Sequence, residues 1–396
     1  MSDEDNKPPV NQWKTLDKDL KRIGRLEAGA HTVSRGLIAP GVALAFIVLA
    51  GLAAALLMGG QPGHLVVVAA AVIGAYMALN IGANDVANNM GPAVGSKAMT
   101  LGLALVLAAV FESLGALVAG GDVVNTVAKG IIAPNALPDS AHFVWAMMAA
   151  LLAAALWLNL ATWLGAPVST THSIVGGVVG AGIVAAGFGA VDWGTMGMIA
   201  ASWVISPMMG GIIAALFLAI IKTKVVYVDD KIAAARKWVP ILIGIMAGAF
   251  AAYLALKGLK HLFDISLLQA VLIGIAAGVA CWLVTIPLIR RQSEGMENRK
   301  KSLKSLFSLP LIVSAALLSF AHGANDVANA VGPLAAIVHT IEQGDVASQV
   351  GIPFWVMAVG ALGISFGLLL FGPKLIRLVG NEITKLNPMR AYCVAL

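Results

Sequence analysis

The sequence has few charged residues and few cysteines, and each shortage excludes a class of protein. Only 12% of the 396 residues are charged and 59% are hydrophobic, whereas soluble domains have about 25% charged residues. The chain is therefore a polytopic membrane protein. The two cysteines, Cys281 and Cys393, are isolated, so they provide neither a disulfide framework nor a metal-binding spacing.

The sequence also lacks the signatures of an enzyme and of a nucleotide-driven pump. No Ser/His/Asp or His/Glu spacing supplies a nucleophile with a base or a metal cluster, and nucleotide-binding loops are missing. The net charge of +6 does not indicate a nucleic-acid partner, because the basic residues cluster in loops, where they set membrane topology. Residues 1–35 lack the apolar core and cleavage site of a signal peptide, and we expect a retained cytoplasmic segment.

Long apolar runs predict an all-α protein of about ten membrane spans, each near the ~20 residues that cross a bilayer. The predicted spans are residues 37–59, 64–90, 99–120, 141–164, 172–189, 196–221, 239–257, 267–289, 308–334 and 351–372. A transmembrane β-barrel is excluded, since its strands alternate over about ten residues.

Loop charges predict the orientation of these spans. The loops after residues 221 and 289 are rich in Lys and Arg, whereas residues 335–350 contain neither. The positive-inside rule then places the first two loops and the N-terminus in the cytoplasm, in the plasma (inner) membrane of the cell.

One seven-residue string occurs twice inside apolar runs. Residues 82–88, Gly-Ala-Asn-Asp-Val-Ala-Asn, recur as residues 323–329, and a Gly-Pro pair follows each copy at the same distance. A charged side chain at the membrane centre costs about 3 kcal/mol or more, so Asp85 and Asp326 indicate function. The predicted topology makes the two copies antiparallel, as an inverted-topology repeat requires.

The residue types around each copy predict a cation site. Glycine and Gly-Pro weaken the helix on both sides, and we expect broken helices with exposed carbonyl groups. These carbonyls, Asp85, Asp326 and the amides of Asn84 and Asn325 would hold Na⁺. Alternatively the aspartates carry protons, or the asparagines only join helices by hydrogen bonds.

A second polar string predicts an anion site. Residues 167–172, Pro-Val-Ser-Thr-Thr-His, lie without any charge between two apolar runs, which favours a hairpin that re-enters the membrane. Its Ser/Thr hydroxyls and the free N–H groups of the following helix would bind an anion. The alternative is that the same hydroxyls only cap the helix.

Together, the duplicated Asn-Asp string and the Pro-Val-Ser-Thr-Thr-His string resemble those of the inorganic phosphate transporter (PiT) family over about residues 64–396. The resemblance implies an alternating-access symporter of inorganic phosphate with Na⁺ or H⁺, two inverted repeats and a homodimer in the lipid bilayer, with no resident cofactor. It implies that substrate lies between the Asn-Asp helices and the hairpin, with cations beside it. Residues that match the family's site are Asn84, Asp85, Asn88, Ser169, Thr170, Thr171, Asn325, Asp326 and Asn329.

Two further residues and several alternatives stay open. Glu112 lies mid-span, where the family also has a glutamate, and we expect a cation-coupling role or a structural pair. His322 precedes the second motif, where the first copy has Ile81, and either titrates or is a satisfied core residue. Sulfate or a metal–phosphate complex could replace phosphate on the same scaffold, and an anion channel is a further alternative.

The chain departs from the family pattern in two ways. A second hairpin string is missing, and we expect it beyond Leu396, which makes the sequence a C-terminally truncated fragment. Residues 36–60 form an extra N-terminal transmembrane helix. The expected organisation continues with a first repeat at 61–222, connecting spans and basic loops at 223–306, and an incomplete second repeat at 307–396.

Overall fold

The computed structural model describes residues 36–121, 131–132, 137–258, 264–346, 351–380 and 386–396. These residues are almost entirely helical, with only one isolated β-bridge between Ile132 and Val191. Within these ranges, nine helices are long and apolar enough to cross a membrane. The polar segment at 1–35 lies outside the described residues. The all-α membrane architecture is therefore confirmed.

The chain divides into two compact units, residues 1–46 and 47–396. In the first unit, residues 36–46 are helical and begin the helix Gly36–Leu57. The second unit holds all the remaining elements. They are α2 (His64–Gly95), α3 (Leu101–Ala119), α5 (Ser140–Leu164), α6 (Thr170–Ala186), η2 (Phe188–Ala190), α7 (Trp193–Ile221), η3 (Lys222–Val226), α8 (Lys231–Lys257), α9 (Leu267–Gln292), α10 (Lys300–Gln343), α11 (Phe354–Leu378) and α12 (Pro388–Ala395).

Nine of the ten predicted spans correspond to membrane-length helices. The exception is 172–189, where the structure has the 17-residue helix α6. At about 1.5 Å per residue, α6 is only about 25 Å long, which is short of the ~30 Å hydrocarbon core.

Short polar side chains begin several of the helices. Asp139, Ser169, Asp192 and Ser266 each accept a hydrogen bond from a backbone N–H in the first turn of α5, α6, α7 and α9, respectively. Such caps satisfy donors that have no partner inside the helix. The ends of the apolar runs are therefore also marked by local sequence.

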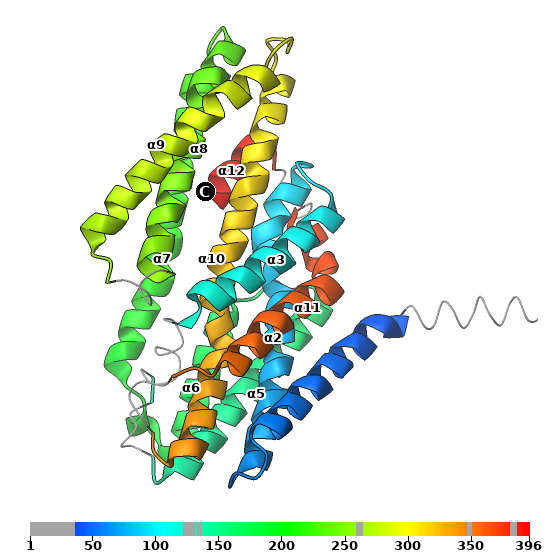
Figure 1. The fold of residues 1–396 in the computed structure, drawn as a ribbon, viewed down its shortest axis with the longest axis vertical. Coiled ribbons are helices and arrows are strands. Elements are labelled where there is room, and N and C mark those ends of the chain that lie inside the picture. Colours follow the sequence, from blue (N-terminus) through cyan, green and yellow to red (C-terminus); the bar gives the residue numbers. More distant parts are fainter. Residues whose placement is uncertain (1–35, 122–130, 133–136, 259–263, 347–350, 381–385) are drawn as a thin grey trace, which may run out of the picture. The chain divides into compact units, whose positions relative to one another are not determined.

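The long helices α2 and α10 form the centre of the second unit and run in opposite directions (Figure 1). The N-terminal end of α2 lies at the C-terminal end of α10, where Gly63 faces Ile341, and Gly74 faces Leu334 further along. More than half of the most apolar stretch of each helix is buried. Both Asn-Asp strings therefore lie inside protein rather than against lipid.

The breaks predicted at the two strings are not present. Helix α2 is continuous from His64 to Gly95 with Pro92 inside it, and α10 is continuous through Pro333. The glycines instead permit close packing, because a Cβ at Gly82 would overlap the Ile364 carbonyl of α11. A Cβ at Gly323 would likewise overlap the backbone of α3. Each string thus packs against a neighbouring helix without unwinding.

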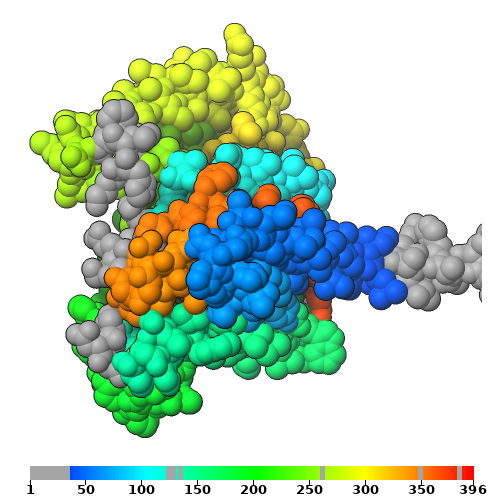
Figure 2. Space-filling view, turned by 60° about the horizontal axis from the view of Figure 1, so that its bottom comes forward, coloured from blue at the N-terminus to red at the C-terminus, as the bar shows by residue number. Residues whose placement is uncertain are grey.

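The same arrangement brings α3 and α11 together. The hydroxyl groups of Ser113 and Ser365 lie 2.5 Å apart, and Ser365 also donates to the carbonyl of Ala109 at 2.9 Å. Figure 2 shows α3 (cyan) between the α8–α9 pair (yellow-green) and the adjoining ends of α10 and α11 (orange).

The two basic loops lie at one end of the second unit. The Asn298 side chain accepts from Lys231 N at 2.9 Å and donates to the Asp229 carbonyl at 2.7 Å. Arg236 Nε donates to Ser293 Oγ at 2.7 Å. The expectation that both loops share one side of the membrane agrees with these contacts.

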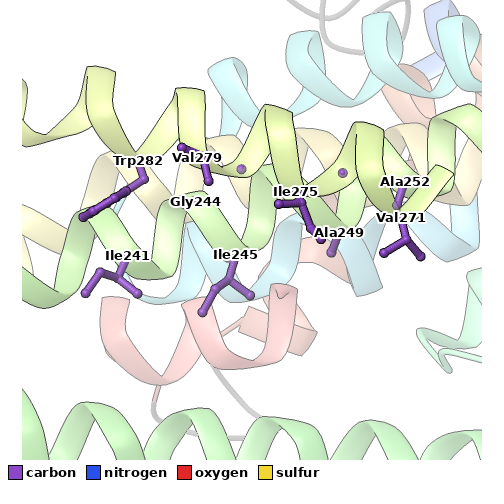
Figure 3. A pocket seen from close by; sticks show the side chains of 12 residues that line it. Ile241, Gly244, Ile245, Ala249, Ala252, Val271, Ile275, Val279 and Trp282 are labelled. Atoms are coloured by element: carbon purple, nitrogen blue, oxygen red, sulfur yellow. The ribbon is translucent and has the colours of Figure 1, made fainter. Parts of the chain in front are cut away.

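An apolar groove lies along the surface where α8 and α9 pack against each other (Figure 3). It encloses about 620 Å³, and the indole N–H of Trp282 is its only side-chain polar group. An anion gains no charge-assisted hydrogen bonds there. The groove is therefore excluded as a phosphate site.

Candidate functional site

A polar cavity of about 420 Å³ lies where α2, α10 and the start of α6 meet. The residues that line it are Asp85, Asn88, Pro167, Val168, Ser169, Thr170, Thr171, His322 and Asp326. Both Asn-Asp strings and the hairpin string contribute, although the three segments are far apart in sequence. The cavity therefore joins the predicted anion and cation residues in one space.

Asn84 fixes the hairpin loop to α2. Its side-chain Nδ2 donates to Thr162 Oγ1 at 3.0 Å and to the Ala166 carbonyl at 3.2 Å, and its Oδ1 accepts from Val168 N at 3.0 Å. The residue is 0% exposed. Its amide is consumed by these bonds, so Asn84 positions the hairpin instead of facing the cavity.

The α10 side chains hold the other side of the hairpin. Thr170 Oγ1 donates to Asp326 Oδ2 at 3.2 Å, and Asn329 Nδ2 donates to the hydroxyl oxygens of Thr170 at 3.3 Å and Thr171 at 3.2 Å. The start of α6 is thus clamped between the two strings. Its orientation in the cavity is set by both motif helices together.

The N-terminus of α6 offers donors to an anion. Ser169 caps it by accepting from His172 N at 3.2 Å, and the first intrahelical bond runs from Ser173 N to the Ser169 carbonyl. The N–H groups of Thr170 and Thr171 precede that bond, and helix starts of this kind favour negative charge. Capping and anion binding are therefore compatible here.

An acidic cluster forms the opposite wall. His322 Nε2 lies 2.9 Å from Asp326 Oδ2 and 3.6 Å from Asp85 Oδ2, and Nδ1 lies 3.5 Å from Glu112 Oε2. Within the described part of the chain, four polar atoms of the cluster are buried without a hydrogen-bond partner: Asp85 Oδ2, Glu112 Oε2 and both His322 nitrogens. Three carboxylates around one imidazole leave excess negative charge.

The cluster has the composition of a cation site. One ligand atom from each of Asp85, His322 and Asp326 can be chosen so that all lie within 4.8 Å of one another. Carboxylate oxygens bind hard cations, whereas imidazole favours transition metals. The two aspartates are therefore the stronger ligands for an alkali-metal ion.

Glu112 lies behind His322, wholly buried. Its Oε1 accepts from Asn89 Nδ2 at 2.9 Å, which turns Oε2 toward the imidazole. The expected pairing of Glu112 is thus found, and Glu112 reaches the cavity only through His322.

The remaining predicted residues differ in position. Asn88 lines the cavity, whereas Asn325 is exposed and donates to the Ala321 carbonyl of its own helix at 2.9 Å. The His172 ring packs against Trp203 with centroids 3.9 Å apart and the two planes tilted by 43°. Asn325 is therefore the one matched residue that the described structure keeps away from the others.

Three contributing residues were missed or undervalued from sequence. Asn89 directly follows the first string and has no counterpart after the second, where Ala330 stands. Thr162 is indistinguishable from other polar residues at a helix end. The sequence alone allows His322 to be either a core residue or a titrating one. Its contacts with three acids show that it belongs to the site.

Comparison with known proteins identifies the scaffold. The sequence profile of the Phosphate transporter family (PHO4) matches residues 81–396. The chain belongs to this family. Members are transporters and not enzymes, and the resemblance noted from the two strings is confirmed.

Individual relatives cover most of the chain. A protein of Helicobacter pylori named "Putative phosphate permease" is 47% identical over 383 residues, which are 96% of this chain and 72% of that protein. The Arabidopsis thaliana protein "Inorganic phosphate transporter 2-1, chloroplastic" is 38% identical over 81% of this chain and 59% of its own length. A solved structure titled "The sodium-dependent phosphate transporter" superposes with a TM-score of 0.78 at 35% identity, covering 84% of this chain and 82% of that one.

Proposed function

We propose that this phosphate transporter is a symporter that carries inorganic phosphate together with Na⁺. The observation that carries the proposal is the placement of anion donors and unpaired carboxylates in one cavity. A phosphate that binds at the α6 N-terminus comes close to Asp85 and Asp326. Charges buried at low dielectric must be balanced, so cations have to bind before or with the anion.

In this proposal the two aspartates are the cation ligands. Asp85 Oδ2 has no hydrogen-bond partner among the described residues, and Asp326 Oδ2 has the Thr170 hydroxyl. Asn88 adds an amide oxygen at the cavity wall. The solved relative is titled sodium-dependent, which favours Na⁺ as the coupling ion.

Phosphate would be held by the hairpin. The N–H groups of Thr170 and Thr171 and the Ser169 hydroxyl are donors that approach the cavity from one side. A phosphate that carries a proton can also donate to an aspartate, and this bond is charge-assisted. Sulfate at neutral pH has no such proton, so the carboxylates favour phosphate over sulfate.

A proton is the second candidate for the coupling ion, and His322 is the observation that favours it. An imidazolium ion within 3.6 Å of both aspartates would neutralise charge where Na⁺ would otherwise bind. The two ions therefore compete for one cluster in this scheme.

The opposed directions of α2 and α10 support an alternating-access mechanism. In this scheme residues 61–222 and 307–396 are inverted repeats that rock against each other around the cavity. The hairpin between α5 and α6 re-enters the membrane. The basic loops favour a cytoplasmic N-terminus, with the protein in the plasma (inner) membrane of the cell. Two copies would form the homodimer that the family resemblance implies.

The test is uptake of radiolabelled phosphate into proteoliposomes. An inward Na⁺ gradient should drive uptake, excess sulfate should not compete, and a proton gradient alone should drive little. Asp85→Asn and Asp326→Asn should each abolish Na⁺-dependent uptake while the protein elutes as a folded species. Asp264→Asn, a change in an exposed loop, should transport normally.

Two outcomes would contradict the proposal. Wild-type uptake by either aspartate variant would show that the carboxylates do not couple the cation. Uptake driven only by the proton gradient would replace Na⁺ by H⁺, with phosphate still the substrate.

A further inference from the structure

A second cavity of about 670 Å³ lies between α2, α5 and α11 in the same unit as the polar cavity. Its polar lining is formed by Asn80, Asn159, Thr162, Lys374 and Arg377, and Trp163 and Phe371 are among its apolar walls. Of these residues only Thr162 contributes to the first site, by accepting a hydrogen bond from Asn84. The cavity therefore needs its own explanation.

The lining of the second cavity is mostly apolar but includes amide groups. Asn159 Nδ2 donates to Asn80 Oδ1 at 3.2 Å, and Asn80 Nδ2 donates to the Tyr76 carbonyl at 2.8 Å. Asn159 is nevertheless exposed. An amide that faces hydrocarbon loses its hydrogen bonds with water at a cost of a few kcal/mol. An aqueous or ligand-filled space explains why Asn159 is tolerated there.

The rim of the cavity is cationic. Lys374 Nζ donates to the Trp163 carbonyl at the end of α5 at 2.6 Å, and Arg377 lies one turn further along α11. Among the residues that the structure describes, no carboxylate lies within ion-pair distance of either side chain. Basic residues are common at helix C-termini, but here they border a cavity whose interior carries amides.

Asn84 stands between the two cavities. Its neighbour Ala83 lines the second cavity, and its other neighbour Asp85 lines the first. The Asn84 side chain bonds to Thr162, a lining residue of the second cavity, and to Val168 N, part of the wall of the first. Hydrogen bonds of one residue therefore join the two linings.

We propose that the second cavity is a phosphate-binding vestibule, which the anion occupies as it enters or leaves the central site past Asn84. Lys374 and Arg377 attract the anion and the amides of Asn80 and Asn159 solvate it. The hydrogen bonds of Asn84 to the hairpin form the barrier between the two spaces. This inference rests on the proposed function, because it assigns a path to the same substrate.

Inorganic phosphate fits the cavity better than the headgroup of an anionic phospholipid, which has the same charged group. A headgroup would use the cationic rim and leave its chains against Trp163 and Phe371. The contact of Asn84 with Thr162 lies next to that rim, and the amides of Asn80 and Asn159 lie one turn further along α2 and α5. A small hydrated anion uses this whole lining, whereas a lipid does not.

The experiment measures thiol modification by a charged, membrane-impermeant methanethiosulfonate. Cys281→Ala and Cys393→Ala provide a cysteine-free parent, into which Asn159→Cys is introduced. Leu156→Cys is the matched control, since Leu156 lies one turn earlier on α5, is 54% exposed and does not line the cavity. We expect Asn159→Cys to react at least tenfold faster, and millimolar phosphate to slow it severalfold while gluconate does not.

A second pair keeps the test decisive if Asn159→Cys does not fold. Leu370 lines the cavity and its neighbour Leu369 does not, so Leu370→Cys should behave as Asn159→Cys and Leu369→Cys as the control. Adding Lys374→Gln and Arg377→Gln together should raise the phosphate concentration that gives half-protection about tenfold.

Three results would overturn the inference. They are equal reactivity of cavity and control cysteines, protection by anionic lipid in place of phosphate, and protection unaffected by loss of the two cations. Protection is measured at equilibrium and needs no gradient. Its failure in a parent that takes up phosphate would reject the vestibule alone, whereas a parent without uptake would reject the proposed function.

Discussion

Replacing Asn84 and Asn325 separately by alanine should have very different effects, although the two residues occupy the same place in identical strings. Asn84 makes three hydrogen bonds to the hairpin and its approach and is fully buried, whereas Asn325 is exposed and bonds only to its own helix. Side-chain hydrogen bonds in membranes average about 0.6 kcal/mol and reach about 1.7 kcal/mol. Asn84→Ala also leaves Val168 N–H without its acceptor, which adds about 1–3 kcal/mol.

The sum predicts that Asn84→Ala lowers the free energy of unfolding by about 2–4 kcal/mol. Asn325→Ala should change it by no more than about 0.5 kcal/mol, as is usual for exposed positions. Unfolding in mixed micelles of a mild detergent and dodecyl sulfate, followed by tryptophan fluorescence, measures both values. Equal losses for the two variants would refute the reasoning, because the strings would then be structurally equivalent.

Three further changes test other contacts. Gly82→Ala should lower the free energy of unfolding by about 3 kcal/mol or prevent folded protein from accumulating, because the new Cβ meets the α11 backbone. Size-exclusion chromatography should show much less folded protein than for Gly102→Ala, where the space is open, and equal amounts would contradict this. Asn89→Ala removes the donor to buried Glu112, so the free energy of unfolding should fall by about 1–3 kcal/mol. The Na⁺ concentration that gives half-maximal uptake should rise, and an unchanged value would show that Glu112 does not affect cation binding. Hydrogen bonds from the imidazole and from the backbone N–H of His142 hold the pKa of Asp139 below its usual range, so the stabilisation by this carboxylate is present at neutral pH and lost as pH falls through that lowered pKa. Asp139→Asn should flatten acid unfolding below about pH 4, and an unchanged curve would contradict this.

Much of the fold could be predicted from sequence because membrane burial leaves a strong signal. Runs of about twenty apolar residues have few solutions other than spanning helices, and nine of them are found as such. The fate of glycine and proline in α2 and α10 could not be predicted in the same way. Gly82 could permit either an unwound segment or close packing, and only the neighbouring backbone of α11 decides for packing.

The candidate site was predictable as a set of residue types but not as an arrangement. The duplicated string identifies Asp85 and Asp326, because ionised groups are rare inside membranes. It does not distinguish Asn84 from Asn325, since the difference lies in their contacts: Asn84 bonds to Thr162, Ala166 and Val168, and Asn325 bonds to its own helix. Likewise Asn89 is adjacent to the string in sequence, yet its contact is with a residue of α3.

Differences in the residues around the two identical strings explain why the described part of the chain has one such acidic cluster and not two. In sequence register, His322 corresponds to Ile81, and Asn89 corresponds to Ala330. Aligning Ser113 of α3 with Ser365 of α11 places Glu112 opposite Ile364. The polar members of these pairs are His322, Asn89 and Glu112, and Glu112 contacts both of the others. Ile81 and Ile364 are buried apolar residues.

A duplicated scaffold that carried His322, Glu112 and Asn89 on both sides would place four carboxylates near one anion in place of three. Confining His322, Glu112 and Asn89 to one side leaves only Asp85 and Asp326 as the shared, symmetric carboxylates. In the proposed mechanism, fewer carboxylates near the anion require fewer cations to neutralise them. Placing a second histidine by Ile81→His should therefore disturb packing against α11 without creating a second cation site, and an increase in the number of Na⁺ ions coupled per phosphate would contradict this account.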